Sequence, residues 1–453
     1  MKKGNRLTLA LALLLVGTLL TSIFIGGCAQ TETTTTATTT ATTTATTTVT
    51  PTLKEPITIA VLTPLTGPVA TVGTGIYRGA VGMAEAFNDQ GGILGHEVVV
   101  TVRDTKMDPA TSIAHVKELL GKDIVYFMGM PATFTSEAVA PLLDAEDVVG
   151  LLGIDRARFA GGPYDHVWHA WPATDTIEAG EAAIINERFP DTVKWAIISA
   201  DYPYGHATWL DFSYAFHQLD NRFETVYESW HPFGSSGGYS ESIRAAMAAG
   251  AEGVYTSMWG ADLAAFMQEA LQLGMFDAID TFTCSYVDWE IVFNLGSEVP
   301  EGYWGECYEP WDVLYNNPIA ENWEDKMAEL YGDEVLQIGM GGAILGAEQV
   351  ALYKAAIEKA NSLEPAKIRE ALDDLTFQGA LGESYLRGFD KVLYGHIPFF
   401  HVVPDASEPY GFKITESWDQ LSIDSMLSDE DTANYAATRD AYFESNGHPE
   451  QAP

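Results

Sequence analysis

Residues 57–68 read Ile-Thr-Ile-Ala-Val-Leu-Thr-Pro-Leu-Thr-Gly-Pro, and they begin the part of the chain that can fold. The β-branched apolar run Ile57–Thr63 predicts a buried strand, and the prolines and glycine after it predict a loop. Val72–Asn88 follows with apolar residues at helical spacing and stops at Gly91-Gly92, which predicts a helix. A strand, a loop and a helix in this order form the repeating unit of an α/β fold.

The same unit recurs along most of the chain. Further predicted strands are Glu97–Arg103, Ile124–Met128, Val148–Leu152, Trp195–Ser199, Thr225–Trp230, Gly253–Ser257, Thr281–Tyr286 and Ile397–Val403. One predicted helix begins at Asp108-Pro109. The other predicted helices are Phe134–Leu143, His206–Leu219, Ser240–Ala249, Leu263–Leu273, Asn322–Leu330, Gly341–Ala360 and Pro365–Leu372. The alternation breaks near Trp171–Asp175, so we expect two α/β lobes, each a doubly wound parallel sheet with helices on both faces.

The N-terminus carries the pattern of an exported, tethered protein. A basic start precedes the apolar stretch Leu7–Ile25, and Gly26-Gly27-Cys28 resembles a bacterial lipobox, which predicts lipidation of Cys28. The alternative is an uncleaved helix that spans the bilayer. Thr31–Thr52 is almost wholly Thr and Ala, which predicts an extended stalk because nothing in it can form a core.

Charge and composition exclude several functions. The 453 residues include 24 Lys and Arg against 63 Asp and Glu, a net charge of −39, which argues against nucleic acid and against docking on anionic lipid through a basic patch. Three cysteines exclude a disulfide scaffold, although Cys284 and Cys307 are a candidate pair. The ten histidines show no metal-ligand spacing, so we expect no metal and no cofactor.

Two glycine-rich motifs could indicate an enzyme, but neither fits. Gly234–Gly238 matches G-x-S-x-G, yet it follows an edge-like strand and Pro232, which favours an ordinary loop over a nucleophile elbow. Gly73, Gly75 and Gly79 have the wrong spacing for a dinucleotide fingerprint. We therefore expect no enzymatic activity.

Three loops at predicted strand ends favour ligand binding, because open α/β sheets bind ligands at the carboxyl ends of their strands. Thr133 opens a helix whose N-terminus favours a carboxylate; the alternative is N-capping by Thr133 or Ser136. Tyr204 and Trp259 follow strands of the second lobe and would supply flat walls, or else belong to the core or surface.

An ordered set of residues between Ile57 and Val403 resembles the branched-chain amino-acid-binding proteins, the type 1 periplasmic solute receptors of ABC transporters. These residues are Leu62–Pro68, Gly73, Gly79-Ala80, Phe87-Asn88, Gly91–Gly95, Asp104, Asp108-Pro109, Gly129, Thr133, Ala138, Pro141, Tyr204-Gly205, Gly234–Ser240 and Ala251–Tyr255. The resemblance implies two lobes joined by a three-segment hinge. The hinge segments would lie near Pro172–Asp175, Glu309–Trp311 and His396–Phe399.

The resemblance also implies the residues that hold the ligand. The ligand carboxylate would meet Thr133 and the loop Gly153–Arg156, which includes Ile154, Asp155 and Arg156. Arg156 would pair with that carboxylate, or else lie on the surface or pair with Asp155. In the family, an acidic side chain meets the ammonium group of the ligand. The matching position here is Tyr286, with Asp288 two residues further on, so the ligand is expected to be an amino acid or organic acid with an apolar or aromatic body.

These expectations divide the chain into segments and leave two functions open. The segments are a signal peptide with lipobox (1–27), a Thr-rich linker (28–55), the first lobe (56–172 and 310–396), the second lobe (173–309 and 397–405) and an acidic tail (406–453). The leading function is a lipid-anchored, extracytoplasmic receptor that delivers a small solute to ABC permease subunits. The alternative is a ligand-sensing ectodomain of the same fold.

Overall fold

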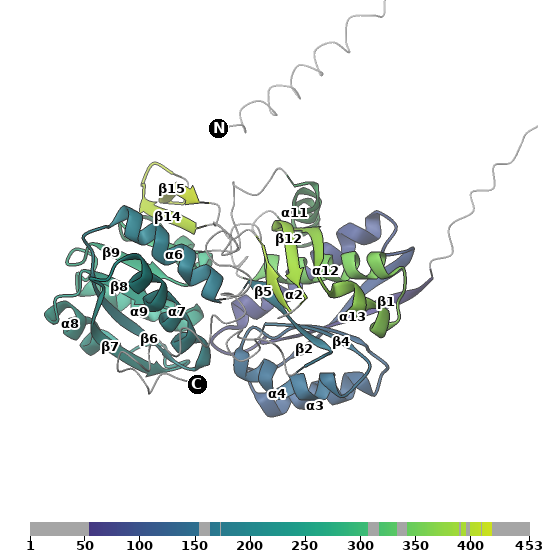
Figure 1. Cartoon of the computed structure of the whole chain (residues 1–453). Coiled ribbons are helices and arrows are strands. Elements are labelled where there is room, and N and C mark those ends of the chain that lie inside the picture. Colours follow the sequence, from purple (N-terminus) through teal and green to yellow (C-terminus); the bar gives the residue numbers. More distant parts are fainter. Residues whose placement is uncertain are drawn as a thin grey trace, which may run out of the picture. The chain divides into compact units, whose positions relative to one another are not determined.

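The computed structural model describes residues 54–153, 164–172, 174–306, 317–332, 342–388, 391–395, 399–408 and 410–418. The chain divides into two units, residues 1–52 and 53–453. All described residues belong to the second unit, which contains two sheets with helices on both faces (Figure 1). We call the first sheet with its helices lobe 1 and the second sheet with its helices lobe 2.

The sheet of lobe 1 has the strand order β11-β12-β13-β5-β4-β3-β1-β2. Its parallel part consists of β1 (Lys54–Thr63), β2 (His96–Asp104), β3 (Tyr126–Gly129), β4 (Val149–Leu152), β5 (Val167–Pro172) and β13 (Val392–Tyr394). The edge strand β11 (Leu375–Gly379) and its neighbour β12 (Gly382–Arg387) complete the sheet, and β12 is antiparallel to both β11 and β13.

Helices cover both faces of this sheet because its central strands are apolar on both sides. Residues Ile59 and Val61 of β1 pack on the face covered by α2 (Ala70–Asp89) and α12 (Ala343–Ala360). The alternate residues Ala60 and Leu62 pack on the face covered by α3 (Pro109–Leu120) and α4 (Thr133–Asp144). The remaining helices of lobe 1 are α11 (Pro318–Tyr331) and α13 (Pro365–Leu372).

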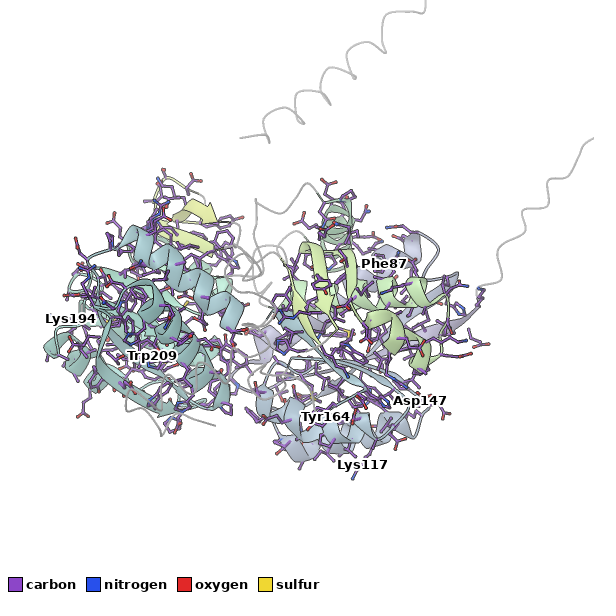
Figure 2. The ribbon with its side chains drawn as sticks, viewed as in Figure 1. Phe87, Lys117, Asp147, Tyr164, Lys194 and Trp209 are labelled. Atoms are coloured by element: carbon purple, nitrogen blue, oxygen red, sulfur yellow. The ribbon has the colours of Figure 1, made fainter. Side chains whose placement is uncertain are left out.

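The sheet of lobe 2 has the order β15-β14-β10-β9-β8-β6-β7. Its strands are β6 (Lys194–Asp201), β7 (Glu224–Pro232), β8 (Gly253–Thr256), β9 (Thr281–Cys284), β10 (Tyr303–Glu306), β14 (Phe399–Pro404) and β15 (Phe412–Trp418). Its helices are α6 (Thr174–Arg188), α7 (Pro203–Leu219), α8 (Ser240–Ala248), α9 (Gly260–Gln272), α10 (Trp289–Leu295) and a 3-10 turn, Gly296–Glu298. Trp209 of α7 is buried against this sheet, and Phe87 is buried on α2 of lobe 1 (Figure 2).

The chain passes from lobe 1 to lobe 2 where the sequence predicted the break. β5 ends at Pro172 in the first sheet, and α6 begins at Thr174 and packs on lobe 2. Two further changes of sheet occur between β10 and α11 and between β13 and β14. The other two predicted hinge segments lie outside the described residues, apart from Phe399, the first residue of β14.

The structure differs from the sequence-based expectation mainly in elements that are short or lack a continuous apolar run. The sheets are mixed rather than wholly parallel, since β11, β12, β14 and β15 pair antiparallel. The sequence did not predict β5 and α6, because β5 is interrupted by His169 and indole side chains and α6 carries acids that are buried in the fold. It also did not predict the short elements β10, β11, β12, β13 and α10. The boundary at residue 405 is too early: Phe412–Trp418 continues the sheet of lobe 2 as β15, because its alternating side chains suit an edge strand.

Glycines let α2 and α12 approach backbone to backbone. A Cβ added at Gly79 would lie 1.8 Å from the carbonyl oxygen of Ala343, and one added at Gly346 would lie 2.0 Å from that of Ile76. A Cβ at Gly73 would lie 1.7 Å from the carbonyl oxygen of Pro64. Close packing therefore accounts for Gly73 and Gly79 without a nucleotide.

No helix within the described ranges combines the length and apolar composition that a bilayer crossing requires.

Candidate functional site

The loop between β3 and α4 presents the start of a helix at a strand end of lobe 1. Gly129 has φ +97°, and a Cβ there would lie 2.6 Å from the carbonyl oxygen of Leu62, so only glycine fits. The Gly129 amide donates to Oε1 of Gln349 (3.1 Å), and the Met130 amide donates to the Leu62 carbonyl (2.7 Å). These bonds fix the backbone that leads into α4.

Thr133 is the first residue of α4, and its side chain is buried. The N-cap is Ala132, which has no side-chain cap, so the alternative interpretation of Thr133 or Ser136 as the N-cap is wrong. The Ser136 hydroxyl instead donates to the carbonyl of Gly153 (2.6 Å). The Thr133 hydroxyl makes no hydrogen bond within the described part of the chain, and the helix dipole there favours an anion.

An aromatic cluster faces the strand ends of lobe 2. It consists of Tyr202, Tyr204, Phe233 and Trp259, with Phe233 centred 4.8 Å from Tyr202 and 5.6 Å from Trp259. The Trp259 Nε1–H donates to the Tyr202 hydroxyl (2.6 Å). Burial raises the pKa of Tyr202 far above its ordinary value, so this wall is uncharged. Tyr204 is half-buried, and its hydroxyl lies 3.1 Å from Oγ of Ser285.

Tyr286 and Asp288 follow β9, which ends at Cys284 and not at Tyr286 as the sequence predicted. Both are buried, and Asp288 is the N-cap residue of α10. Its Oδ2 accepts the amide hydrogen of Gly260 (3.1 Å), so this carboxylate already helps to hold the start of α9. The Tyr286 carbonyl accepts from the thiol of Cys284 (3.0 Å).

The two lobes meet at these loops. The ring of Phe134, next to Thr133, lies edge-on to Phe233 with centroids 6.4 Å apart. The amide of Ala261 in α9 donates to the carbonyl of Pro68 in lobe 1 (3.4 Å). The helix start on lobe 1 and the aromatic wall on lobe 2 therefore lie on facing loops.

The structure adds three residues to those that the sequence singled out. Phe134 and Tyr202 lie within two residues of a predicted site residue in the chain, whereas Phe233 contacts Trp259 only in the fold. Strand-end position alone did not distinguish these three residues from core residues. The predicted residues Ile154, Asp155, Arg156, Cys28 and Cys307 lie outside the described residues. The roles assigned to them, including the pairing of Cys284 with Cys307, remain predictions.

The glycine-rich loop after β7 is held by acidic side chains. The carboxylate of Asp262 accepts the amides of Gly234 and Ser236 (2.6 Å each), and β7 is an edge strand as predicted. Within the described ranges, no group of three or more His, Cys, Asp or Glu side chains is arranged to hold a metal ion.

Two α/β lobes that bring strand-end loops together define a two-lobed binding protein. The chain belongs to the periplasmic binding protein family, whose model matches residues 56–406.

Individual relatives match shorter stretches. The chain is 33% identical over 93 residues to Leu/Ile/Val-binding protein homolog 3 of Brucella melitensis, which covers 20% of this chain and 25% of the relative. It is 30% identical over 108 residues to the Leu/Ile/Val-binding protein of Escherichia coli K12, 24% of this chain and 29% of the relative. These matches therefore span about a quarter of the relatives' length.

Solved structures share the fold over a longer range. An amino acid ABC transporter substrate-binding protein from Pseudomonas fluorescens Pf-5 is similar with a TM-score of 0.71 and 17% identity, covering 82% of this chain and 98% of that protein. A solute-binding protein of an ABC transporter from R. palustris, in complex with 4-hydroxybenzoate, has a TM-score of 0.67 and 18% identity, covering 81% and 98%. At these identities, the similarity establishes the fold.

Proposed function

We propose that the protein is an extracytoplasmic substrate-binding lipoprotein that captures a small carboxylate and delivers it to an ABC importer. The ligand is an amino acid or organic acid with an apolar or aromatic body. Binding and release, without catalysis, are its whole activity.

One observation carries this proposal: the Phe134–Phe233 contact places the start of α4 opposite the aromatic cluster of lobe 2. The Thr133 hydroxyl and the helix dipole favour an anion. Tyr202, Phe233 and Trp259 offer uncharged faces that suit a planar or apolar body. A carboxylate at one end of a compact apolar molecule satisfies both features.

Two groups of similar proteins support this ligand class. Those matched by sequence are named for Leu, Ile and Val, whereas two similar structures contain 4-hydroxybenzoate and 3,4-dihydroxybenzoic acid. Both groups of ligands combine one carboxylate with an apolar or aromatic body. Both therefore belong in the first screen.

A thermal-shift screen tests the function. Wild-type protein is heated with L-leucine, L-phenylalanine, 4-hydroxybenzoate, the neutral isostere 4-hydroxybenzamide, or glucose. A ligand present at about 100 times its Kd stabilises the folded state by about 2.7 kcal/mol, so at least one acid should raise the Tm. Stabilisation by glucose or the amide alone would contradict the proposed class.

Thr133→Ala should weaken binding of the acid found in that screen by roughly 1.5–3 kcal/mol, the value of one hydrogen bond to a charged group. Isothermal titration calorimetry measures the loss. Thr133→Ser keeps the hydroxyl and should bind within a factor of two or three. Equal affinity of Thr133→Ala and wild type would remove Thr133 from the site.

Arg156→Ala should lose more binding free energy than Thr133→Ala if Arg156 makes the bidentate contact proposed for it.

Lipid anchoring through Cys28 is a separate prediction. Cys28→Ser should release the protein from the membrane or leave it unprocessed, because the sulfur atom of Cys28 would carry the lipid. Membrane fractionation of the producing cells, with the mass of the mature chain, measures the effect. A Cys28→Ser protein that is cleaved and still sediments with membranes like wild type would contradict it.

A further inference from the structure

Residues at the start of α9 form hydrogen bonds with loops of both lobes. Trp259 donates to the Tyr202 hydroxyl, and the Gly260 amide donates to Asp288. The Ala261 amide donates to the carbonyl of Pro68 in lobe 1. The carboxylate of Asp262 holds the loop beside Phe233 through the amides at 234 and 236. Consecutive residues thus link the aromatic wall to a contact between the lobes.

The lobe 1 side of this contact is also held in place. The loop before Pro68 is fixed by Asp104, whose carboxylate accepts the amide of Leu65 (2.8 Å) and the hydroxyl of Thr66 (2.7 Å). Val69, which follows Pro68, is buried. Because both partners are anchored within their own lobes, a change in their separation requires the lobes to move.

Gly260 lies directly at the contact. Its φ is +58°, and an added Cβ would lie 3.1 Å from the carbonyl oxygen of Pro68 and 3.3 Å from Cγ1 of Val69. Both distances are tighter than most Cβ contacts, so a side chain there requires the Pro68 loop to shift by a few tenths of an ångström. Glycine at residue 260 therefore lets the Pro68 loop approach without this shift.

We propose that Gly260 is a positioning residue for lobe closure: it lets the first turn of α9 dock on the Pro68 loop, so that the aromatic wall and the interlobe contact move as one unit. This inference rests on the proposed binding function. It adds a specific point at which closure is controlled, outside the residues that would touch the solute.

A pair of matched glycines tests it. Gly260→Ala and Gly250→Ala both place a side chain at a positive φ, but Gly250 has no atom within 4 Å of the added Cβ. Both variants therefore carry the backbone strain, and only Gly260→Ala crowds the contact with Pro68 and Val69. Comparing them separates docking from strain.

The first readout is amide hydrogen exchange of the full chain, resolved to single residues and with no solute added. The Ala261 amide is in the first turn of α9, so no helical carbonyl accepts it, and its protection reports the bond to Pro68. We expect it to exchange about tenfold faster in Gly260→Ala than in Gly250→Ala or wild type. The amide of residue 260, bound to Asp288 within lobe 2, should stay protected in both variants. Equal exchange of the Ala261 amide in all three proteins would overturn the inference.

The second readout is calorimetric titration of L-leucine and 4-hydroxybenzoate. If either binds wild type, Gly260→Ala should bind it at least about fivefold more weakly, and Gly250→Ala within twofold. If the Ala261 amide exchanges faster in Gly260→Ala but the affinity is unchanged, Gly260 controls docking on the Pro68 loop, and the proposed link between that docking and the aromatic wall is wrong. If neither solute binds wild type, the proposed ligand class loses its support, and hydrogen exchange still decides whether Gly260 controls the contact.

Discussion

Raising the pH from 5 to 9 is expected to lower the thermal stability of the protein, and Glu181→Gln is expected to remove much of that loss. Glu181 lies on α6 with 1% of its surface exposed, and it accepts a hydrogen bond from the hydroxyl of Thr283. Burial raises its pKa from the ordinary 4.5 to about 8. The folded protein therefore binds a proton that the unfolded chain has released at neutral pH.

The sign follows from this difference in proton binding. The contribution of Glu181 is fully present below about pH 4.5, declines as the pH rises, and is lost once the pH has passed about 8. Each pKa unit by which the folded protein differs from the unfolded chain corresponds to about 1.4 kcal/mol of stability. Glutamine resembles the protonated carboxyl, so Glu181→Gln should be more stable than wild type at pH 9 and have a smaller change in Tm between pH 5 and 9.

Two further variants make the test specific. Glu348 of α12 is also buried, accepts the hydroxyl of Ser384 (2.7 Å), and has its pKa raised by burial to about 7, so Glu348→Gln should remove a second part of the loss. Glu118→Gln is the control, because the hydrogen bond from Arg103 lowers the pKa of Glu118 to about 2, so Glu118 does not titrate between pH 5 and 9. This variant should keep the wild-type change in Tm over that range. Parallel Tm–pH curves for wild type and Glu181→Gln would show that Glu181 is ionised in the folded state.

Gly79→Ala is expected to destabilise lobe 1 by at least about 3 kcal/mol. The added Cβ would lie 1.8 Å from the carbonyl oxygen of Ala343, which belongs to the backbone of α12 and cannot rotate away. Overpacking of a core commonly costs 1–3 kcal/mol, and a clash with backbone requires the helices to separate. Chemical denaturation followed by circular dichroism measures the loss.

Gly121→Ala is the matched control for Gly79→Ala. Gly121 has φ −66° at the end of α3, and a Cβ there would lie 3.5 Å from its nearest neighbours, an ordinary contact. It should change the stability by less than about 1 kcal/mol. If both variants unfold at the same denaturant concentration as wild type, α2 and α12 are not packed as closely as described.

The sequence by itself determined the alternation of strands and helices, the break between two lobes and the strand ends where a ligand could bind. Runs such as Ile57–Thr63 are apolar on both sides, which is typical of a parallel strand covered on both faces. Local chemistry also placed the start of α3, where the Asp108 carboxylate accepts the amide of Thr111 (2.6 Å) as its pattern predicted. Thr133, Tyr204 and Trp259 could be singled out because strand ends share one edge of a sheet.

Only the tertiary structure decided which of those residues face one another. Phe134 and Phe233 are far apart in the chain, and their contact depends on how the two lobes meet. The same is true of Gly260, whose need for glycine comes from a loop in the other lobe. The burial of Glu181 likewise depends on α6 packing over the sheet of lobe 2, since a glutamate in a helix ordinarily predicts a solvated face. Spacing along a chain specifies periodicity and chain direction, whereas a contact between distant segments depends on the packing of the whole fold.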